Sequence, residues 1–557
     1  MVGNLLERSD SLAVGYAVSE RLLGLAIRLI RLVVVVCVSA CADLPPRGVV
    51  EYSNAITDTE STVLGQVAGR STRSGYSGVA LLPAGEFAFG ARSALTAKAE
   101  RSIDVQYFHL HFDPAGSEFL RELRDAARRG VRVRLLVDDL HAAGTYRLLT
   151  GLAAHDGVQV RLFNPLPVRQ GDVQARMWQS WYDINRFNSR MHNKLFVADN
   201  AVAIVGGRNI ADEYFMRHAV ANFVDLDVIV AGPVVHDLSH SFDWYWNSDL
   251  AYPMHALLPV PDPAQSRVSF DQAVDAFDSD WLRQPAADRH GQTPIAIQLE
   301  QGKLQLHVAN ARVYVDPPSK AAMSRALGAM RIGNWMNRDW LQSEQSSQSI
   351  ALLSVMNVLA MAESDVYIVN PYIVPGQAGM AAMNAVVKRG VQARVYTNSL
   401  GSTDHLMVHV AYSRYRADLL RMGVDLYELN AESAGRGGRL GAFGKSIARM
   451  HTKVAIADRR WVAVGSANLD SRSAFSNTEL TVVLDCAPLA DELIQLILND
   501  YQTSMYRLRL AEYGSMIEWL WTDADGKTKL TSEEPLIERL PTGPERLKFL
   551  VVDEDLL

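Results

Sequence analysis

The chain contains two nearly identical ten-residue stretches, RMHNKLFVAD at residues 190–199 and RMHTKVAIAD at residues 449–458. His, Lys and Asp occupy matched positions in the two copies. Six residues separate each Asp from a Gly-Gly or Gly-Ser pair, and Asn209 or Asn468 lies two positions after that pair. A duplicated core strand would explain the apolar residues of the stretch. It would not explain the matched polar residues, so the repeat predicts a duplicated functional site.

The repeat extends upstream of the motif. A helical pattern stops at Gly130 in the first half and at Gly390 in the second, and glycine after basic residues is a typical helix stop. A run of strand-forming residues follows each glycine. Gly130 lies 62 residues before His192, and Gly390 lies 61 residues before His451. We therefore expect two α/β units with mostly parallel or mixed sheets, packed face to face about an internal pseudo-two-fold axis.

A chain of 557 residues is too long for one compact core, which agrees with two units plus additional segments. The expected division is residues 1–41 as an export signal, 42–81 as a tether, 82–260 as the first unit, 261–345 as a linker or insertion without a counterpart in the repeat, 346–510 as the second unit, and 511–557 as a C-terminal appendage.

The N-terminal segment has the features of an export signal. Arg28 and Arg31 precede the apolar run 32–38, and small residues lead to Cys41. The ending Val-Ser-Ala-Cys resembles a bacterial lipobox, so we expect a membrane-associated protein of the cell envelope, anchored by a lipid on Cys41. The alternatives are an incorrectly assigned start and an uncleaved anchor, although the apolar run is much shorter than the ~20 residues of a membrane span.

Composition excludes some classes of protein. The formal net charge is −7, which provides no general attraction to nucleic acid, so no nucleic-acid partner is expected. Two of the three cysteines lie in the N-terminal segment, so the folded part has no disulfide framework. His109 and His111 form a close pair without Cys or acidic residues at ligand spacing, so no metal site is expected.

The motif residues suit chemistry at a phosphodiester. His192 and Lys194, like His451 and Lys453, are two positions apart, which places both side chains on one face of an extended strand. Two facing units would bring all four groups into one pocket. One imidazole would attack phosphorus to form a phosphohistidine, while the other would protonate the leaving alkoxide and later deprotonate the incoming alcohol or water. Such a site needs no metal or other cofactor.

Further residues are expected to support this reaction. Each histidine needs a carboxylate on its second ring nitrogen, and aligning the halves puts Asp225 and Glu479 at one repeat position. The aspartates Asp199 and Asp458 lie beyond the apolar run and are expected to serve the fold. The candidate phosphate-binding groups are the two motif lysines and residues of the glycine turns, namely Gly207, Asn209, Ser466 and Asn468.

The doubled pattern HxKxxxxD, then six residues and G-G/S-x-N, resembles the phospholipase D superfamily over residues 82–505. The resemblance implies two α/β/α domains with the active site at their interface, and it counts Asp199 and Asp458 with the catalytic motifs. Five shorter stretches are similar to the bacterial cardiolipin synthase C group: 104–107, 162–165, 190–194, 206–215 and 397–400. That group implies transfer of a phosphatidyl group to phosphatidylglycerol, with phosphatidylethanolamine as a second candidate lipid.

Several alternatives stay open. The symmetric motifs do not say which histidine is the nucleophile, although the resemblance favours His192, with His451 as acid and base. With water as the acceptor the same site would be a phospholipase D or, less in keeping with the composition, a nuclease; a non-catalytic lipid-binding scaffold is the third alternative. The donor, the acceptor, any accessory protein and the oligomeric state are not readable. Because the lipids are anionic, we expect a positive pocket around Lys194, Lys453 and Arg208.

Overall fold

The computed structural model describes residues 44–48, 50–169, 171, 173, 175, 176, 183–258, 262–277, 291, 293–322, 349–431, 446–512, 516–522 and 526–535. The predicted lipobox and Cys41 lie outside these residues. Among the described residues, no helix combines the length and the apolar character that crossing a bilayer requires.

Each unit is built on a mixed sheet, and eight strands follow the same order in both, from β9 to β1 in the first and from β18 to β10 in the second. The first sheet runs β9 (Ala251–Pro253), β4 (Val158–Phe163), β3 (Arg132–Asp138), β2 (Ser102–Tyr107), β5 (Leu195–Ala198), β6 (Val202–Gly206), β8 (Asp227–Ala231) and β1 (Ser77–Leu82). The second runs β20 (Thr528–Thr531), β19 (Ile517–Thr522), β18 (Met505–Leu510), β13 (Asp425–Leu429), β12 (Gln392–Asn398), β11 (Asp365–Val369), β15 (Val454–Ala457), β16 (Trp461–Gly465), β17 (Leu480–Asp485) and β10 (His307–Val315). The predicted α/β class is confirmed.

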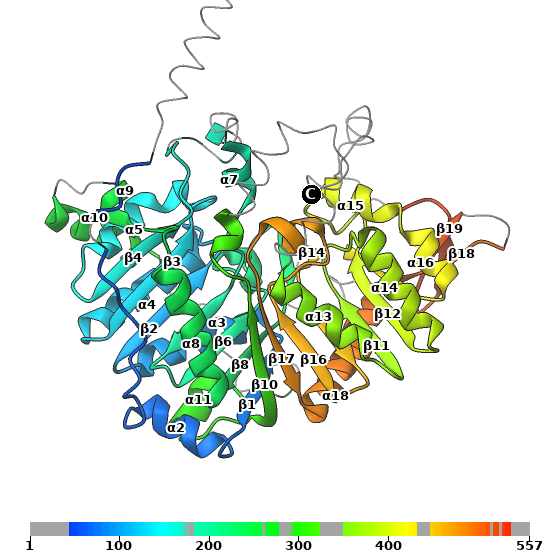
Figure 1. Ribbon diagram of the computed structural model, residues 1–557, viewed down its shortest axis with the longest axis horizontal. Helices are drawn as coiled ribbons and strands as arrows, with labels where there is room; N and C mark the ends of the chain where they lie inside the picture. Colours follow the sequence, from blue (N-terminus) through cyan, green and yellow to red (C-terminus); the bar gives the residue numbers. More distant parts are fainter. Residues whose placement is uncertain are drawn as a thin grey trace, which may run out of the picture.

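The two sheets join edge to edge, so the expected face-to-face packing is wrong: β1 and β10 are edge strands whose free backbone groups pair with each other. Strand β1 pairs antiparallel with β10, with Ser77 opposite Ala309 and Val79 opposite His307. The two strands lie side by side at the centre of the molecule in Figure 1. A shared apolar core also contains residues of both sheets and of helices α8 (Pro233–Trp246) and α18 (Ala487–Leu496). The units are therefore held together both by backbone pairing and by a common core.

Helices cover the remaining faces of the sheets. In the first unit they are α2 (Val63–Ser71), α3 (Gly85–Lys98), α4 (Pro114–Arg128), α5 (Tyr146–Ala153), α7 (Ile184–Asn188), α9 (Met254–Leu257), α10 (Pro263–Asp275) and α11 (Ile295–Glu300). In the second they are α13 (Ile350–Ala360), α14 (Gly376–Lys388), α15 (Leu406–Ser413) and α16 (Arg416–Met422).

Local sequence explains where helix α4 begins and ends. The Asp113 side chain caps the helix by accepting a hydrogen bond from the Gly116 N–H (2.9 Å), and Pro114 takes the first helical position, where no N–H is needed. Gly130 follows the last turn with a φ of +94°, a conformation that other residues rarely adopt. Gly390 stops α14 in the same way, with a φ of +87°.

Two expected segments differ from the structure. Residues 42–81 are not simply a tether, because they contain α2 and most of β1. Residues 261–345 include β10, which occupies in the second unit the place that β1 has in the first, so this segment does have a counterpart in the repeat. Strand β1 is almost entirely buried and has no period-2 pattern, whereas in β10 the apolar Ala309, Ala311 and Val313 alternate with Asn310 and Arg312, a pattern typical of a strand. At the C-terminal edge, β19 and β20 extend the second sheet.

Candidate active site

Both motif histidines lie in extended segments that lead into a strand. His192 and Lys194 immediately precede β5, and His451 and Lys453 immediately precede β15. The Lys194 Nζ donates to the carbonyl oxygen of His192 at 2.6 Å, and Lys453 makes the same 2.6 Å bond to His451. The predicted position within a strand is therefore wrong, but each lysine lies against the backbone of its own histidine.

Backbone pairing between the units brings the two motifs together. The His192 N–H donates to the carbonyl of Thr478 (2.9 Å), and the His451 N–H donates to the carbonyl of Val224 (2.8 Å). Strands β7 (Ala221–Val224) and β14 (Ile447–Met450) form a small parallel sheet next to the second of these contacts. Each motif is thus paired with the residue that precedes the other unit's candidate carboxylate.

As a result, the two histidine–carboxylate pairs cross between the units. The Nδ1 of His192 lies 2.9 Å from Oε2 of Glu479, and the Nδ1 of His451 lies 2.6 Å from Oδ2 of Asp225. A carboxylate against Nδ1 holds the proton on that nitrogen and leaves the lone pair on Nε2. The alignment of the halves selects these two carboxylates; the exchange of partners between units is added by the structure.

The glycine turn makes room for the carboxylates. A Cβ added at Gly207 would lie 2.2 Å from Oδ1 of Asp225. At the same repeat position, the Ser466 hydroxyl donates to Oε2 of Glu479 (2.5 Å), and the Ser473 hydroxyl donates to Oε1 of Glu479 (2.7 Å). A glycine therefore accommodates the shorter carboxylate, and a serine binds the longer one.

The predicted phosphate-binding role of this turn needs correction. The Gly207 N–H donates to the carbonyl of Leu226 (3.1 Å), and the Ser466 N–H donates to the carbonyl of Leu480 (2.9 Å), so neither amide is available to an anion. The Asn209 side chain accepts from the His109 N–H (3.2 Å) and donates to the hydroxyl of Tyr214 (2.9 Å).

Asn468, the counterpart of Asn209 in the second unit, has a different hydrogen-bonding environment. The side-chain oxygen of Asn468 is buried and has no hydrogen-bond partner within the described part of the chain. The two asparagines therefore occupy matched positions in the sequence but not matched environments.

The motif aspartates lie at the other end of their strands and stabilise the fold. The Asp199 carboxylate accepts from the N–H groups of Arg101 (2.7 Å) and Ser102 (3.0 Å), where β2 begins. Asp458 accepts from the N–H of Ser364 (2.7 Å), just before β11. These contacts favour a structural role for both aspartates, and the catalytic role that the resemblance implies stays a prediction.

Arg208 also lies outside the catalytic pocket. Its guanidinium is fully buried and donates to the carbonyls of Leu82 (2.8 Å), Pro83 (2.7 Å) and Asp225. The expected positive pocket therefore does not include Arg208, which instead connects β1 to the segment that carries Asp225.

The electrostatic environment differs between the two imidazoles. Burial, then Lys194 and Lys453, lower the pKa of His192 well below its ordinary value. Burial and Lys453 also lower the pKa of His451, but Asp225 opposes this shift. His192 is therefore the more firmly neutral imidazole, and His451 is the one that takes up a proton more readily.

The pKa values of the lysines and carboxylates beside the histidines are shifted as well. Burial lowers the pKa of Lys453 to about 8 and lowers the pKa of Lys194 well below its ordinary value. Burial raises the pKa of Glu479. Burial also raises the pKa of Asp225. The positive charges of His451 and Lys453 lower it by more, so the pKa of Asp225 is below its ordinary value. Asp225 is therefore the firmer anion, which agrees with a more readily protonated His451.

Aromatic rings that the motif analysis did not identify enclose the histidines. The Phe108 ring centroid lies 5.2 Å from that of His192 and 5.3 Å from Nζ of Lys194. Tyr214 and Phe223 pack against His451, with centroid distances of 5.3 and 5.0 Å. These rings exclude water from the imidazoles and help to explain their lowered pKa values.

Arg472 is a further site residue that sequence reasoning missed. Its positive charge contributes to lowering the pKa of His192, and its Nε is buried without a hydrogen-bond partner in the described residues. Arg472 lies between Asn468 and Glu479, a segment shorter than the one between Asn209 and Asp225. Alignment of the halves therefore assigns it no counterpart. Within the described residues, no group of three His, Cys, Asp or Glu side chains is arranged to hold a metal ion.

Comparison with known proteins agrees with this geometry. The family model described as "Cardiolipin synthase, PLD-like domain" matches residues 94–246 and 355–501. Cardiolipin synthase C of Escherichia coli (strain K12) is 33% identical over 448 residues, which cover 80% of this chain and 88% of the relative. Cardiolipin synthase A of Pseudomonas putida (strain GB-1) is 25% identical over 427 residues, 76% of this chain and 68% of the relative.

Among solved structures, phosphatidylserine synthase of Haemophilus influenzae Rd KW20 superposes with a TM-score of 0.50 at 11% identity, covering 80% of this chain and 91% of that one. This likeness concerns the fold. The two matched segments each carry one complete motif, and the pairing of Glu479 with His192 joins them in one site. The chain therefore belongs to the cardiolipin synthase family of phospholipase D-like proteins and is an enzyme of that superfamily.

Proposed function

We propose that this enzyme is a cardiolipin synthase-type phosphatidyltransferase that works through a phosphohistidine. The observation that supports it most is the pair of crossed contacts, His192 with Glu479 and His451 with Asp225. Two imidazoles with their Nδ1 atoms occupied present two Nε2 atoms, one for attack and one for proton transfer. Phosphatidylglycerol is the proposed donor and acceptor, with phosphatidylethanolamine as a second candidate donor.

His192 is the proposed nucleophile. Its Nε2 attacks the phosphorus of the donor lipid, a P–N bond forms, and the bond from phosphorus to the headgroup oxygen breaks. A neutral imidazole is required for this step, and burial together with two cations favours the neutral form of His192. Glu479 accepts the hydrogen bond from Nδ1–H and stabilises the positive charge that the ring acquires on attack.

His451 is the proposed acid and base. Its protonated Nε2 gives a proton to the leaving glycerol, and the neutral ring then takes the proton of the acceptor hydroxyl as that oxygen attacks phosphorus and the P–N bond breaks. Asp225, 2.6 Å from Nδ1, stabilises the protonated ring. The negative charge of the bound phosphodiester acts in the same direction, because an adjacent anion raises the pKa of an imidazole.

Positive side chains are proposed to stabilise the transition state. Lys194 and Lys453 lie beside the two histidines, and Arg472 has an unpartnered Nε. In a buried site such groups interact strongly with the charge that grows on the non-bridging oxygens. Lys453, with a pKa of about 8, is largely charged at neutral pH.

Transfer to a lipid alcohol, rather than to water, is supported by the relatives and by the enclosure of the site. The relatives are named as cardiolipin synthases, and both motif histidines are only 6% exposed. Enclosure limits the access of bulk water to the intermediate. The proposed place of action is the bacterial cell envelope, with a lipid on Cys41 as the membrane anchor; labelled palmitate that enters the wild type but not Cys41→Ser would test the anchor.

The products decide between transfer and hydrolysis. The purified chain is supplied with phosphatidylglycerol in mixed micelles, and lipids are identified by mass spectrometry. We expect one cardiolipin for each glycerol released, and no product with His192→Ala. Phosphatidic acid without cardiolipin would make the enzyme a phospholipase D, and no lipid turnover would contradict both lipid functions. Replacing part of the donor by phosphatidylethanolamine, with ethanolamine as the readout, tests the second candidate donor.

A further inference from the structure

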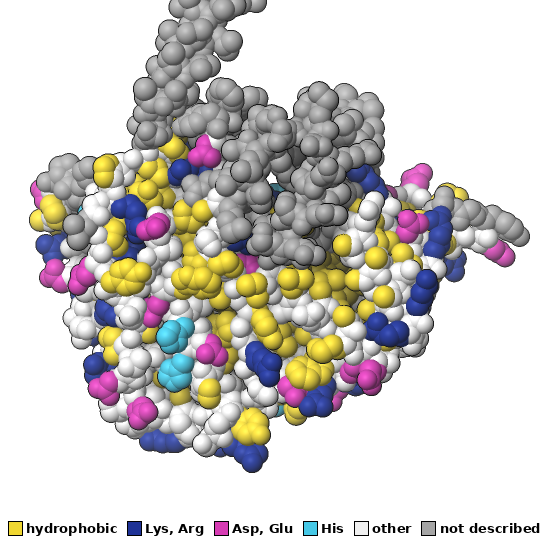
Figure 2. All heavy atoms as spheres, viewed as in Figure 1, with side chains coloured by type: hydrophobic (Ala, Val, Ile, Leu, Met, Phe, Trp, Pro, Cys, Tyr) yellow, Lys and Arg dark blue, Asp and Glu magenta, His cyan; other side chains and the backbone are white. Residues whose placement is uncertain are grey.

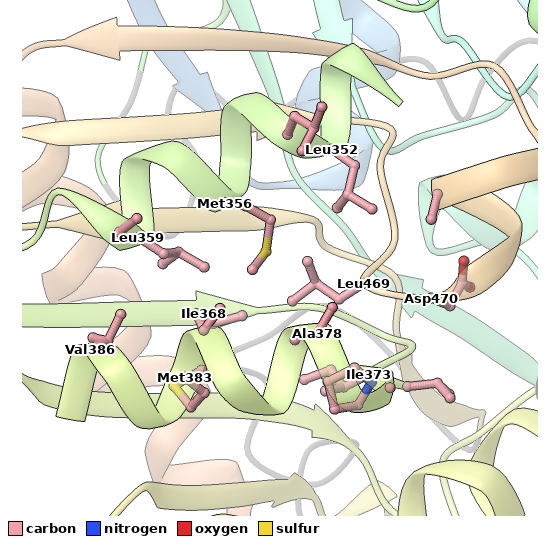
Figure 3. A pocket seen from close by; sticks show the side chains of 18 of the residues that line it. Leu352, Met356, Leu359, Ile368, Ile373, Ala378, Met383, Val386, Leu469 and Asp470 are labelled. Atoms are coloured by element: carbon pink, nitrogen blue, oxygen red, sulfur yellow. The ribbon is translucent and has the colours of Figure 1, made fainter. Parts of the chain in front are cut away.

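The second unit contains an apolar cavity that the proposed reaction does not use. It has a volume of about 540 Å³ and lies between α13 and α14, above strands β11 and β12. Figure 3 shows Met356 of α13, Ile368 of β11 and Met383 of α14 converging on it. Its size is within the ~300–1,000 Å³ range of ligand pockets. Most of its lining is aliphatic, with Ser349, Arg389 and Asp470 among the few polar side chains, so it suits an apolar ligand better than a sugar or a nucleotide.

The two helices around the cavity are incompletely packed. Apolar residues occur on every side of α13, yet Ile350 and Leu353 are 46% and 43% exposed. In α14 only Val386 is buried. Figure 2, which has the same view as Figure 1, shows hydrophobic side chains gathered over these helices. A helix that is apolar on all sides is normally covered, so this part of the described surface has the character of one that contacts apolar material.

One short segment separates the cavity from the catalytic centre. Leu469 and Ala474 line the cavity. Between them, Ser473 turns the other way and donates to Glu479, the carboxylate that binds His192. Arg472, whose charge acts on His192, is on the same segment. A ligand could therefore place an apolar chain in the cavity on one side of this segment and a phosphate at the catalytic centre on the other side.

We propose that the cavity binds one acyl chain of the phosphatidyl donor while its phosphate lies at His192. This inference rests on the proposed function and adds the place where the lipid is held. The lining includes Leu353, which is 43% exposed on the apolar surface, and Leu469 and Ala474 of the catalytic segment, so it reaches both places that a chain drawn from a membrane must reach. The choice of a lipid chain over a second protein follows from a lining that extends along both helices, from Leu352 to Ala360 and from Gly376 to Arg389, with few polar groups for a peptide backbone.

A matched pair of variants separates the cavity from the rest of the helix. Ala382 lines the cavity, whereas the adjacent Ala381 is exposed and does not. Ala382→Trp fills the cavity, and Ala381→Trp adds the same side chain on the outside of α14. The full chain is used in mixed micelles, and equal melting temperatures for the two variants establish that both are folded.

The first readout is binding without turnover. Phosphatidylglycerol with a photoreactive diazirine in one acyl chain is cross-linked to His192→Ala protein, and the labelled peptides are mapped by mass spectrometry. We expect label on α13 and α14, reduced about tenfold by Ala382→Trp and unchanged by Ala381→Trp, as expected when bulk occupies a ligand pocket. The proposal is overturned if the label maps outside α13 and α14, or if both variants are labelled equally. Either result would mean that the cavity holds another part of the chain, a second copy or solvent instead of the acyl chain.

The second readout is kinetic. Ala382→Trp should lower kcat/KM for long-chain phosphatidylglycerol about tenfold while leaving a water-soluble dibutanoyl analogue unaffected, because only the long chain needs the cavity. An equal effect on both donors contradicts the proposal. If the wild type forms no cardiolipin but the cross-link still maps to the cavity, the proposed function fails and the lipid site stands.

Discussion

Glu479 of the second unit lies 2.9 Å from Nδ1 of His192 of the first unit, and the reciprocal contact joins Asp225 to His451. Neither unit therefore contains a complete histidine–carboxylate pair of its own. The site exists only when the two units are associated, which explains why strands β1 and β10 and a shared core hold them together.

The first prediction concerns the orienting carboxylate. Glu479→Gln should lower kcat about a thousandfold or more, because an amide does not hold the imidazole in the required tautomer or stabilise its positive charge. The rate of cardiolipin formation in mixed micelles measures this. Asp491→Asn, at an exposed position, serves as the control and should keep full activity. A loss of less than about threefold in Glu479→Gln would show that the contact has no catalytic role.

The second prediction concerns space beside Asp225. Gly207→Ala adds a methyl group 2.2 Å from Oδ1 of that carboxylate, so the carboxylate must move away from His451. We expect activity to fall about a hundredfold, as displacement of a positioning group does. Gly144→Ala is the matched control, since a Cβ there meets no atom within 4 Å. Full activity in Gly207→Ala would mean that Asp225 does not need its present position.

The third prediction concerns pH. His192 must be neutral to attack, so activity should rise as pH rises through the pKa of His192, which is well below 6.5. His451 must be protonated to give its proton to the leaving group, so activity should fall as pH rises through the lowered pKa of His451. The profile of kcat/KM should therefore be bell-shaped, with both limbs below pH 6.5. In the profile of kcat, the limb due to His451 should shift upward, because the bound phosphodiester raises the pKa of His451.

A substrate with a better leaving group tests this assignment. Phosphatidyl-p-nitrophenol releases a phenolate that needs no proton, so it should lose the alkaline limb due to His451 and keep the acid limb due to His192. A further decline should remain above about pH 8, where Lys453 loses its charge. An alkaline limb below pH 6.5 that persists with this donor would show that it does not report protonation of the leaving group by His451.

The fourth prediction concerns Arg472. Its Nε is buried without a partner in the described residues, and burial lowers the pKa of the guanidinium despite the nearby Asp470 and Glu479, so part of the cost of burying the charge is left for a bound anion to offset. Arg472→Met should raise the melting temperature and lower kcat/KM about tenfold to a hundredfold. Arg460→Met, at an exposed ion pair with Asp485, should leave activity unchanged. A lower melting temperature with full activity would make Arg472 a structural residue.

The fifth prediction separates the motif aspartates from catalysis. Asp199→Ala removes hydrogen bonds to the start of β2 and should destabilise the fold by about 1–3 kcal/mol. The fraction that stays folded at low temperature should keep the wild-type kcat. Denaturant unfolding and active-site titration measure the two quantities. A large fall in kcat per folded site would return Asp199 to the catalytic group.

Much of the fold and part of the site could be predicted because the chain repeats itself. Matched spacings identify the two units, and the same alignment selects Asp225 and Glu479. The exchange of carboxylates between units could not be predicted, since it depends on how the units associate. Arg472 was not predicted because it lies in a segment whose length differs between the two halves. Strand β10 was not predicted although its residues alternate between apolar and polar from Ala309 on, because the segment around it carries none of the repeated motifs.

Direct detection of the covalent intermediate tests the central claim. Full-length wild-type, His192→Ala and His451→Ala proteins are mixed with phosphatidyl-p-nitrophenol, quenched in alkali, digested and analysed for a phosphatidyl group on histidine. We expect an adduct on His192 that is absent from His192→Ala and accumulates in His451→Ala, where the acceptor is no longer deprotonated. An adduct on His451, or p-nitrophenol released without any adduct in either folded protein, would contradict it.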